Sequence, residues 1–268
     1  MVFCEFLERS VTVTFCNSSS FNSTFALETT LRNTHFSVSS YSKYIQKQIP
    51  MKALFDFLKD LSANNNRQWF TENKDRYELV KKKHLAFIQE VIQHLSVYDP
   101  ELIGLEAKET VYRIYRDVRF SPDKSPYKTH IGAYLCKGGR KSPRAGYYIH
   151  LEPGNSLFAG GIWCPEPQVL KLLRAEVYNH TDEFLSLIQA PAFTKIYALS
   201  DEDKLKKVPA PYPKDAPNAE WVKYKSYTAT GKLPDAYFSQ SDIVRKTVQD
   251  LSLFQPLNHF LNQVLDDI

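Results

Sequence analysis

Apolar residues recur at helical spacing in the stretch that follows residue 50. Five of them predict an amphipathic helix that ends near residue 61: Leu54, Phe55, Phe57, Leu58 and Leu61. The three asparagines at 64–66 interrupt this pattern and can cap a following helix. That second helix is expected to run from about Arg67 to Leu95, with an apolar stripe along one side.

Strand-like runs dominate the middle of the chain. We expect four strands there, at 110–119, 130–136, 145–152 and 156–162. The sequence Glu-Pro-Gly-Asn at 152–155 is typical of a tight turn, so the last two strands should form a hairpin.

Helical patterns return in the last hundred residues. One helix is expected from about Pro165 to Ile188 and another helical stretch from Ser241 to Asp267, with a long loop at 199–220 between them. Helices that precede and follow a run of strands indicate an α+β fold. Its antiparallel sheet (about 110–162) should pack with N-terminal and C-terminal helices, and residues 51–268 are expected to form a single domain.

The first fifty residues have a different composition. They are rich in Ser, Thr, Asn and Phe, contain no glycine, and have Pro50 as their only proline. Because the second methionine, Met51, directly precedes the first helical pattern, we interpret residues 1–50 as a disordered or mis-annotated extension. A cleaved targeting peptide is the alternative, although its usual charged and apolar regions are missing.

Positive charge is concentrated in one part of the chain. The whole sequence has a formal net charge of only +4, yet residues 113–144 hold nine Lys and Arg against two acids. A field focused in this way attracts anions. The expected partner is therefore a small anionic ligand, or alternatively a nucleic acid.

The cysteines and the hydropathy exclude several classes of protein. Cys4, Cys16, Cys136 and Cys164 have no short regular spacing, which argues against a zinc ribbon or a disulfide framework. No apolar run approaches the roughly 20 residues that span a bilayer, so we expect a cytoplasmic protein without a membrane partner. P-loop, dinucleotide-binding, α/β-hydrolase and zincin motifs are all missing.

The basic segment supplies most candidate ligand-binding residues. On a strand over 110–119, Arg113, Tyr115, Asp117 and Arg119 would share one face and Arg116 would lie on the other. Guanidinium groups ordered by nearby carboxylates are suited to binding phosphate or carboxylate. The proposed anion-binding residues of this segment are Arg113, Arg116, Asp117, Arg119, Asp123, Lys124, Tyr127, Lys128 and His130.

The hairpin supplies the candidate catalytic residues. Tyr148, His150 and Glu152 share one face, and a histidine beside a carboxylate can exchange protons near neutral pH. His150 and Glu152 are therefore the candidate acid–base pair, with Tyr148 and the stacking surface of Trp163 as further ligand contacts. Spacing defines no third ligand beside this pair, so no metal site is predicted.

Two other interpretations stay open. The basic loop 137–144 could contact the backbone of a nucleic acid. Alternatively, the charged row could be an ion-pair network in a structural or partner-binding module. The pattern identifies no cofactor and no oligomeric state, and it leaves open whether the protein is an enzyme.

Four motifs resemble those of one family. The run at 116–128, Arg-Asp-Val-Arg-Phe-Ser-Pro-Asp-Lys-Ser-Pro-Tyr-Lys, is similar to the signature of a microbial family catalogued as domain of unknown function twenty-four sixty-one. Residues 64–70, 147–153 with 160–163, and 255–261 also resemble that family. The resemblance covers essentially 51–268 and leaves 1–50 outside. It implies no activity, since the family is one of conserved hypothetical proteins.

Overall fold

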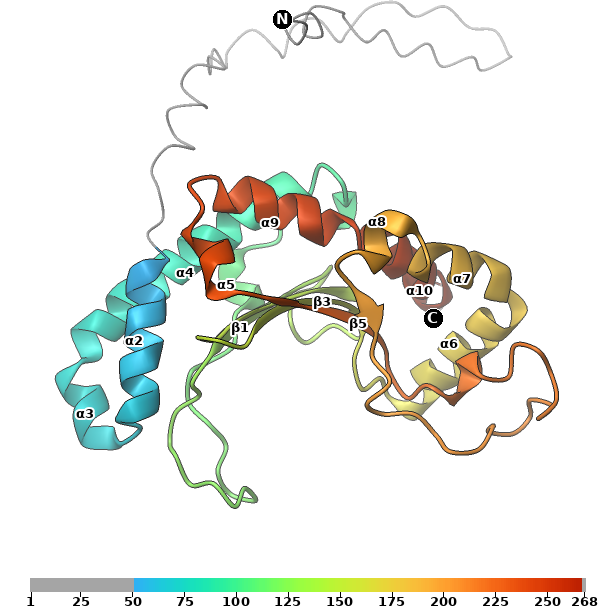
Figure 1. Cartoon of the computed structure of the whole chain (residues 1–268), viewed down its shortest axis with the longest axis horizontal. Coiled ribbons are helices and arrows are strands. Elements are labelled where there is room, and N and C mark those ends of the chain that lie inside the picture. The colour runs from blue at the N-terminus through green and yellow to red at the C-terminus, as the bar shows by residue number, and fades with distance from the viewer. Residues whose placement is uncertain (1–50, 267–268) are drawn as a thin grey trace, which may run out of the picture. The chain divides into compact units, whose positions relative to one another are not determined.

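The computed structural model describes residues 51–266, and these residues form an α+β fold (Figure 1). The predictions made for residues 1–50 lie outside the described residues. The helices are α2 (Lys52–Ala63), α3 (Arg67–Glu72), α4 (Lys74–Leu95), α5 (Ala107–Thr110), α6 (Pro167–Asn179), α7 (Thr181–Ile188), α8 (Pro191–Thr194), α9 (Ile243–Ser252) and α10 (Gln255–Asp266). Short 3₁₀ helices occur at Pro100–Leu102, Trp221–Lys223 and Asp235–Ser239.

The strands form one antiparallel sheet of order β1-β2-β3-β5-β4. They are β1 (Ile131–Leu135), β2 (Gly146–Leu151), β3 (Ser156–Ile162), β4 (Ala198–Leu199) and β5 (Tyr227–Leu233). The predicted hairpin of β2 and β3 is confirmed, with His150 paired to Leu157 across it.

The predicted strand over 110–119 is wrong. Only Val111 and Tyr115 form bridges there, to Ala133 and Tyr127 respectively, and the residues between and beyond them are irregular. The alternation of the segment suggested a strand, but its backbone N–H groups bond at separated points, that of Tyr112 to the carbonyl oxygen of Gly132 and that of Arg116 to the carbonyl oxygen of Pro126. The sheet also contains β5, which the sequence analysis did not predict and which pairs with β3.

Three predicted helical stretches are each divided in two. Asn66 caps α3 by accepting a hydrogen bond from the backbone N–H of Trp69 (2.9 Å), as the sequence predicted. The chain then breaks at Asn73, before α4, and at His180, between α6 and α7. A short break also separates α9 from α10 near Leu253 and Phe254. Each break lets the chain turn so that both halves bury their apolar sides.

Helices cover one face of the sheet. In Figure 1, α4 and α9 lie above it, and both α9 and α10 contact β3. Alternate strand residues on this face are fully buried, among them Tyr147, Ile149 and Phe158. Gly160 allows the closest approach, because a Cβ there would lie 2.3 Å from the ring of Phe254, between α9 and α10.

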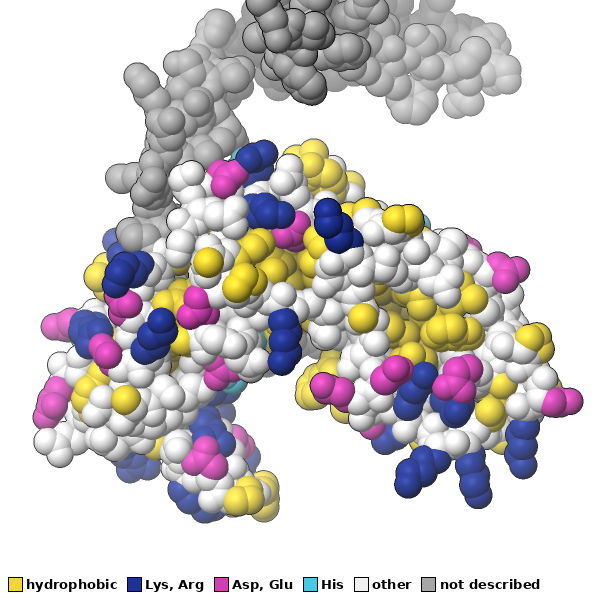
Figure 2. All heavy atoms as spheres, viewed as in Figure 1, with side chains coloured by type: hydrophobic (Ala, Val, Ile, Leu, Met, Phe, Trp, Pro, Cys, Tyr) yellow, Lys and Arg dark blue, Asp and Glu magenta, His cyan; other side chains and the backbone are white. Residues whose placement is uncertain are grey.

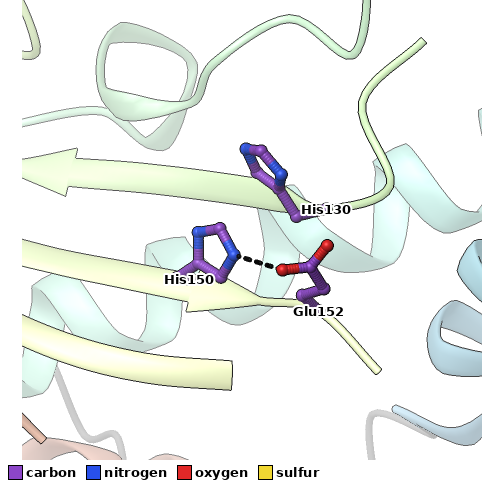
Figure 3. A group of neighbouring side chains, drawn as sticks. All are labelled: His130, His150 and Glu152. Carbon is purple, nitrogen blue, oxygen red and sulfur yellow. Dashed lines mark hydrogen bonds and ion pairs between the residues drawn. The ribbon is translucent and has the colours of Figure 1, made fainter. Parts of the chain in front are cut away.

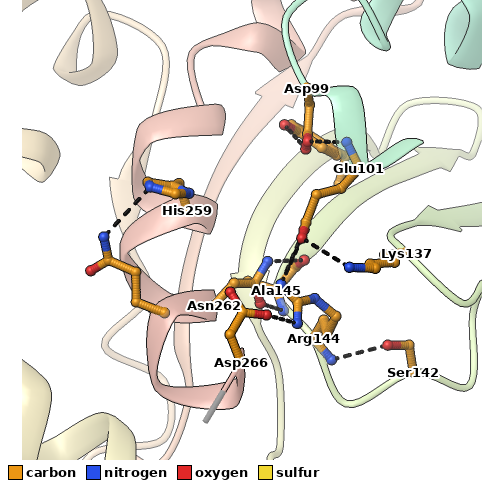
Figure 4. A network of polar contacts seen from close by, with 11 residues as sticks. Asp99, Glu101, Lys137, Ser142, Arg144, Ala145, His259, Asn262 and Asp266 are labelled. Atoms are coloured by element: carbon orange, nitrogen blue, oxygen red, sulfur yellow. Dashed lines mark hydrogen bonds and ion pairs between the residues drawn. The ribbon is translucent and has the colours of Figure 1, made fainter. Parts of the chain in front are cut away.

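Two asparagines of α10 bind the sheet directly, and Figure 4 shows the contact of Asn262 with Ala145. The buried side chain of Asn262 accepts a hydrogen bond from the backbone N–H of Ala145 (2.8 Å) and donates one to its carbonyl oxygen (3.2 Å). One turn earlier, Asn258 accepts from the N–H of Gly161 (2.8 Å). These contacts fix the ends of β2 and β3 against the helix. None of the helices between residues 51 and 266 is long and apolar enough to cross a membrane.

Candidate functional site

The second face of the sheet is not covered by helices. Its strand residues alternate with the buried set and include Tyr134, Tyr148, His150 and Thr230. Figure 2 shows the surface hollowed below the sheet, between two projecting lobes. One lobe belongs to the segment 116–125, and the other contains the long loop at 200–220 together with α6 and α7.

A pocket of about 620 Å³ opens on this face. Its described lining comes from β1, β2, β3, β5, the segment before β1, the loop 137–144 and residues 163–166 after β3. The polar and aromatic lining residues are Tyr112, Arg113, Lys128, His130, Tyr134, Arg140, Lys141, Ser142, Arg144, Tyr148, Trp163, Cys164, Glu166, Thr228 and Thr230. Pockets of this volume are suited to metabolite-sized ligands.

Two histidines and a glutamate meet at one end of this face (Figure 3). His130 directly precedes β1, and His150 and Glu152 lie on and just after β2. Nε2 of His150 lies 3.2 Å from Oε2 of Glu152, and the two imidazole rings lie 4.3 Å apart between centroids. One ligand atom from each of the three residues lies within 4.8 Å of the others.

Hydrogen bonds hold this cluster in place. Thr129 donates to Oε1 of Glu152 (2.7 Å), and Asn155 donates to Oε2 (2.9 Å). Burial would raise the pKa of Glu152, but these hydrogen bonds and the contact with His150 outweigh it and lower the pKa to about 2. Burial, reinforced by the charge of His150, lowers the pKa of His130 to about 4. At neutral pH the carboxylate is therefore ionised and His130 is neutral.

Five residues proposed from the sequence line the pocket: Arg113, Lys128, His130, Tyr148 and Trp163. Trp163 is 79% exposed at the rim, as a ligand-stacking surface requires. The ammonium group of Lys128 lies 5.5 Å from the centre of the Tyr112 ring. Burial, followed by the nearby charge of Arg113, lowers the pKa of Lys128. The structure therefore brings the first and last basic residues of the proposed row to the same pocket.

The other charged residues of that row pair with one another in the projecting segment. Arg119 binds Asp117 through two hydrogen bonds (2.9 and 2.6 Å), and Arg116 pairs with Asp123. Lys124 donates to the carbonyl oxygen of Val118 (3.0 Å). None of these proposed residues is among the described residues that line the pocket.

Tyr127, another residue proposed from the sequence, is part of the hydrophobic core and is not among the described residues that line the pocket. It is 6% exposed and its ring stacks on Phe70 at 3.9 Å. Its backbone N–H donates to the side chain of Asn65 (3.1 Å), whose amide donates back to the Tyr127 carbonyl oxygen (2.9 Å). The asparagine motif at 64–66 thus anchors the end of the basic segment to the helical part of the fold.

Two of the four basic residues of loop 137–144 contact acidic side chains (Figure 4). Arg144 pairs with Glu101 (2.8 Å) and with Asp266 (2.6 Å), and Lys137 lies 3.6 Å from Glu101. Arg140 donates to the carbonyl oxygen of Glu109 (3.1 Å). These contacts join the loop to residues 101–109 and to the end of α10.

Several lining residues were not identified from the sequence. Thr228 and Thr230 lie on β5, and their place depends on a strand that was not predicted. The Thr228 hydroxyl is buried and has no hydrogen-bond partner among residues 51–266. Tyr112 and Cys164 also line the pocket. The only local signal for Cys164 was its position directly after the glycine-rich run 160–163.

Comparison with known proteins assigns the chain to a family. A family model described as "Conserved hypothetical protein (DUF2461)" matches residues 53–260, so the chain belongs to this family and its resemblance is confirmed. No curated protein and no solved structure matches the chain.

Proposed function

We propose that this member of the conserved hypothetical family binds a small anionic ligand, with a phosphate or carboxylate group, in the pocket on the open face of the sheet. The observation that supports the proposal is the charge of the lining. The lining contains one acidic side chain, that of Glu166, and five basic side chains, those of Arg113, Lys128, Arg140, Lys141 and Arg144.

The five basic side chains differ in the contacts that they make with the rest of the protein. Arg144 is engaged by two carboxylates and Arg140 by a backbone carbonyl group. In contrast, Arg113, Lys128 and Lys141 form no ion pair with any residue between 51 and 266. Cations that gather at a concave surface without acidic partners attract an anion, and low-dielectric walls strengthen the interaction.

The remaining lining suits the rest of such a ligand. Trp163 and Tyr112 offer aromatic surfaces, while Thr228 contributes a hydroxyl group that lacks a partner. A few convergent polar groups in a partly apolar pocket are typical of small-molecule sites. The proposal therefore concerns a small molecule whose anionic group lies near Arg113 and Lys128.

The test is thermal unfolding of the full chain with phosphorylated metabolites, dicarboxylates, nucleotides and short oligonucleotides, all in the presence of a chelator. A ligand at 100 times its Kd stabilises the folded state by about 2.7 kcal/mol, which corresponds to a shift of roughly 5–10 °C. We expect a shift with a selective small anion, and its loss in the Arg113→Ala and Lys128→Ala variants.

Arg119→Ala is the matched control, because Arg119 pairs with Asp117 outside the pocket lining. It should bind the ligand as the unchanged protein does. Equal loss in Arg113→Ala and Arg119→Ala, or no shift with any small anion, would contradict the proposal. A shift with oligonucleotides alone that is lost in Lys141→Ala would favour the nucleic-acid interpretation of loop 137–144 instead.

A further inference from the structure

We infer that His130, His150 and Glu152 form a binding site for one divalent transition-metal ion. Their ligand atoms lie within 4.8 Å of one another, and all three side chains are partly buried. The sequence analysis found only the pair on β2, because a His-x-Glu spacing defines no third ligand. The fold supplies that ligand from His130, the residue directly before the neighbouring strand β1 (Figure 3).

The sheet register explains why the three residues meet. β1 and β2 are antiparallel, with Ile131 opposite Leu151 and Gly132 opposite His150. His130, one residue before β1, therefore lies near Glu152, one residue after β2. His150 is on β2, and the other two residues directly adjoin the paired strands, so the sheet limits how far the three can move apart.

The donor set determines the class of ion. Two imidazoles and one carboxylate suit zinc and other first-row divalent ions such as Fe²⁺, Co²⁺ and Ni²⁺. Mg²⁺ and Ca²⁺ prefer oxygen ligands and fit this set poorly. Three protein ligands also leave positions for water or a ligand. His130 and Tyr148 line the pocket, so the site adjoins it.

The groups around the three residues have the arrangement of an outer shell of metal ligands. Thr129 and Asn155 orient the carboxylate of Glu152. The Tyr148 hydroxyl lies 2.9 Å from Nδ1 of His150, and can accept a hydrogen bond from a proton on that nitrogen. In this tautomer the Nε2 lone pair is free for a metal, and such partners orient ligating histidines in metal sites.

The competing explanation is an acid–base pair that needs no metal, with Nε2 of His150 donating to Glu152. It accounts for the 3.2 Å contact between them. It does not require His130, whose ring lies 4.3 Å from that of His150 and one of whose nitrogens lies within 4.8 Å of a possible ligand atom of each partner. The metal inference uses all three residues. It does not depend on the anionic ligand.

Metal binding by the full chain tests the inference. After treatment with a chelator and its removal, calorimetric titration with Zn²⁺ and the visible spectrum of added Co²⁺ should each report one ion per chain. Mg²⁺ should give no comparable binding. His130→Ala and Glu152→Gln should each weaken Zn²⁺ binding by more than about 100-fold, since losing a direct ligand costs at least as much as losing its outer partner.

His94→Ala is the matched control, because His94 is a part-exposed histidine at the end of α4, away from the cluster. It should keep full affinity. Glu152→Gln preserves the size of the side chain, and unfolding curves of each metal-free variant establish that it is folded. The inference is overturned if no divalent transition metal binds, or if stoichiometric binding survives both cluster substitutions.

Discussion

The hydroxyl of Tyr148 lies 2.9 Å from Nδ1 of His150, two residues along the same strand. Both side chains are on the open face of the sheet, and this contact orients the His150 ring. The ring of Tyr148 is itself placed by Gly132, where a Cβ would lie 2.9 Å from that hydroxyl. A glycine on one strand therefore makes room for the tyrosine that orients the histidine on the next.

Removing this hydroxyl tests its role. We expect Tyr148→Phe to fold normally but to bind Zn²⁺ about 10- to 100-fold more weakly, as for other outer partners of metal ligands. Isothermal titration measures the change. Tyr112→Phe is the control, since Tyr112 lines the same pocket and contacts Tyr148 only through its ring. Equal affinities of the Tyr148→Phe and Tyr112→Phe proteins would contradict the assignment.

The ion pair of Asp117 and Arg119 should contribute little to stability. Both side chains are largely exposed, and exposed ion pairs are weak because water screens them. We expect Asp117→Asn and Asp117→Lys to leave the midpoint of thermal unfolding essentially unchanged. Unfolding of the charge-swapped protein at ambient temperature would instead support the interpretation of the charged row as a structural network.

The clamp between Asn262 and Ala145 should be important for stability. Asn262→Ala leaves the buried N–H and carbonyl groups of Ala145 without their side-chain partners, which is expected to lower the free energy of unfolding by about 2 kcal/mol. Urea unfolding measures this difference. Gln263→Ala, at the next and exposed position of α10, should change stability by less than about 0.5 kcal/mol. A similar loss in both variants would show that the clamp has no special role.

Buried His84 should make the fold less stable in mild acid. Burial lowers its pKa from 6.5 to about 4, and its Nε2 has no partner within residues 51–266. Above pH 6.5 the ring is neutral in both states and contributes nothing to the pH dependence. As pH falls from 6.5 towards 4, only the unfolded state takes up the proton, so stability is lost, by about 2 kcal/mol at pH 5.

His84→Leu should remove this part of the acid sensitivity. The drop in unfolding free energy between pH 7.5 and pH 5, measured with urea, should be smaller in His84→Leu than in the unchanged protein by about 2 kcal/mol. His94→Gln serves as the control, because His94 is part-exposed. An unchanged drop in His84→Leu would mean that His84 takes up its proton in the folded state.

The two described cysteines should differ in reactivity. Cys164 is exposed at the pocket, whereas Cys136 is buried and burial raises the pKa of its thiol to about 11. We expect iodoacetamide to modify Cys164 much faster than Cys136, as measured by mass spectrometry of peptides. An anion that binds the pocket should slow the reaction at Cys164. If an anion that stabilises the protein in thermal unfolding does not slow the reaction at Cys164, that anion binds outside the pocket.

Local patterns were enough to predict the fold class and several elements. The helix before residue 64, the cap at Asn66, and the hairpin of β2 and β3 depend on side-chain periodicity and turn chemistry within a few residues. The alternation on β2 also placed Tyr148, His150 and Glu152 on one face correctly. The same reasoning failed at 110–119. Polar and apolar residues alternate there as in a strand, but only Val111 and Tyr115 form isolated β-bridges.

The sequence by itself determined family membership, the antiparallel α+β class and the residue types of the candidate site. Tertiary structure alone decided which of those residues come together. His130 reaches His150 through strand pairing, and Arg113 and Lys128 share a pocket while Arg119 does not. The reason is physical: periodicity records which side of an element a residue faces. Contacts between elements depend on register and packing, which distant parts of the chain set jointly.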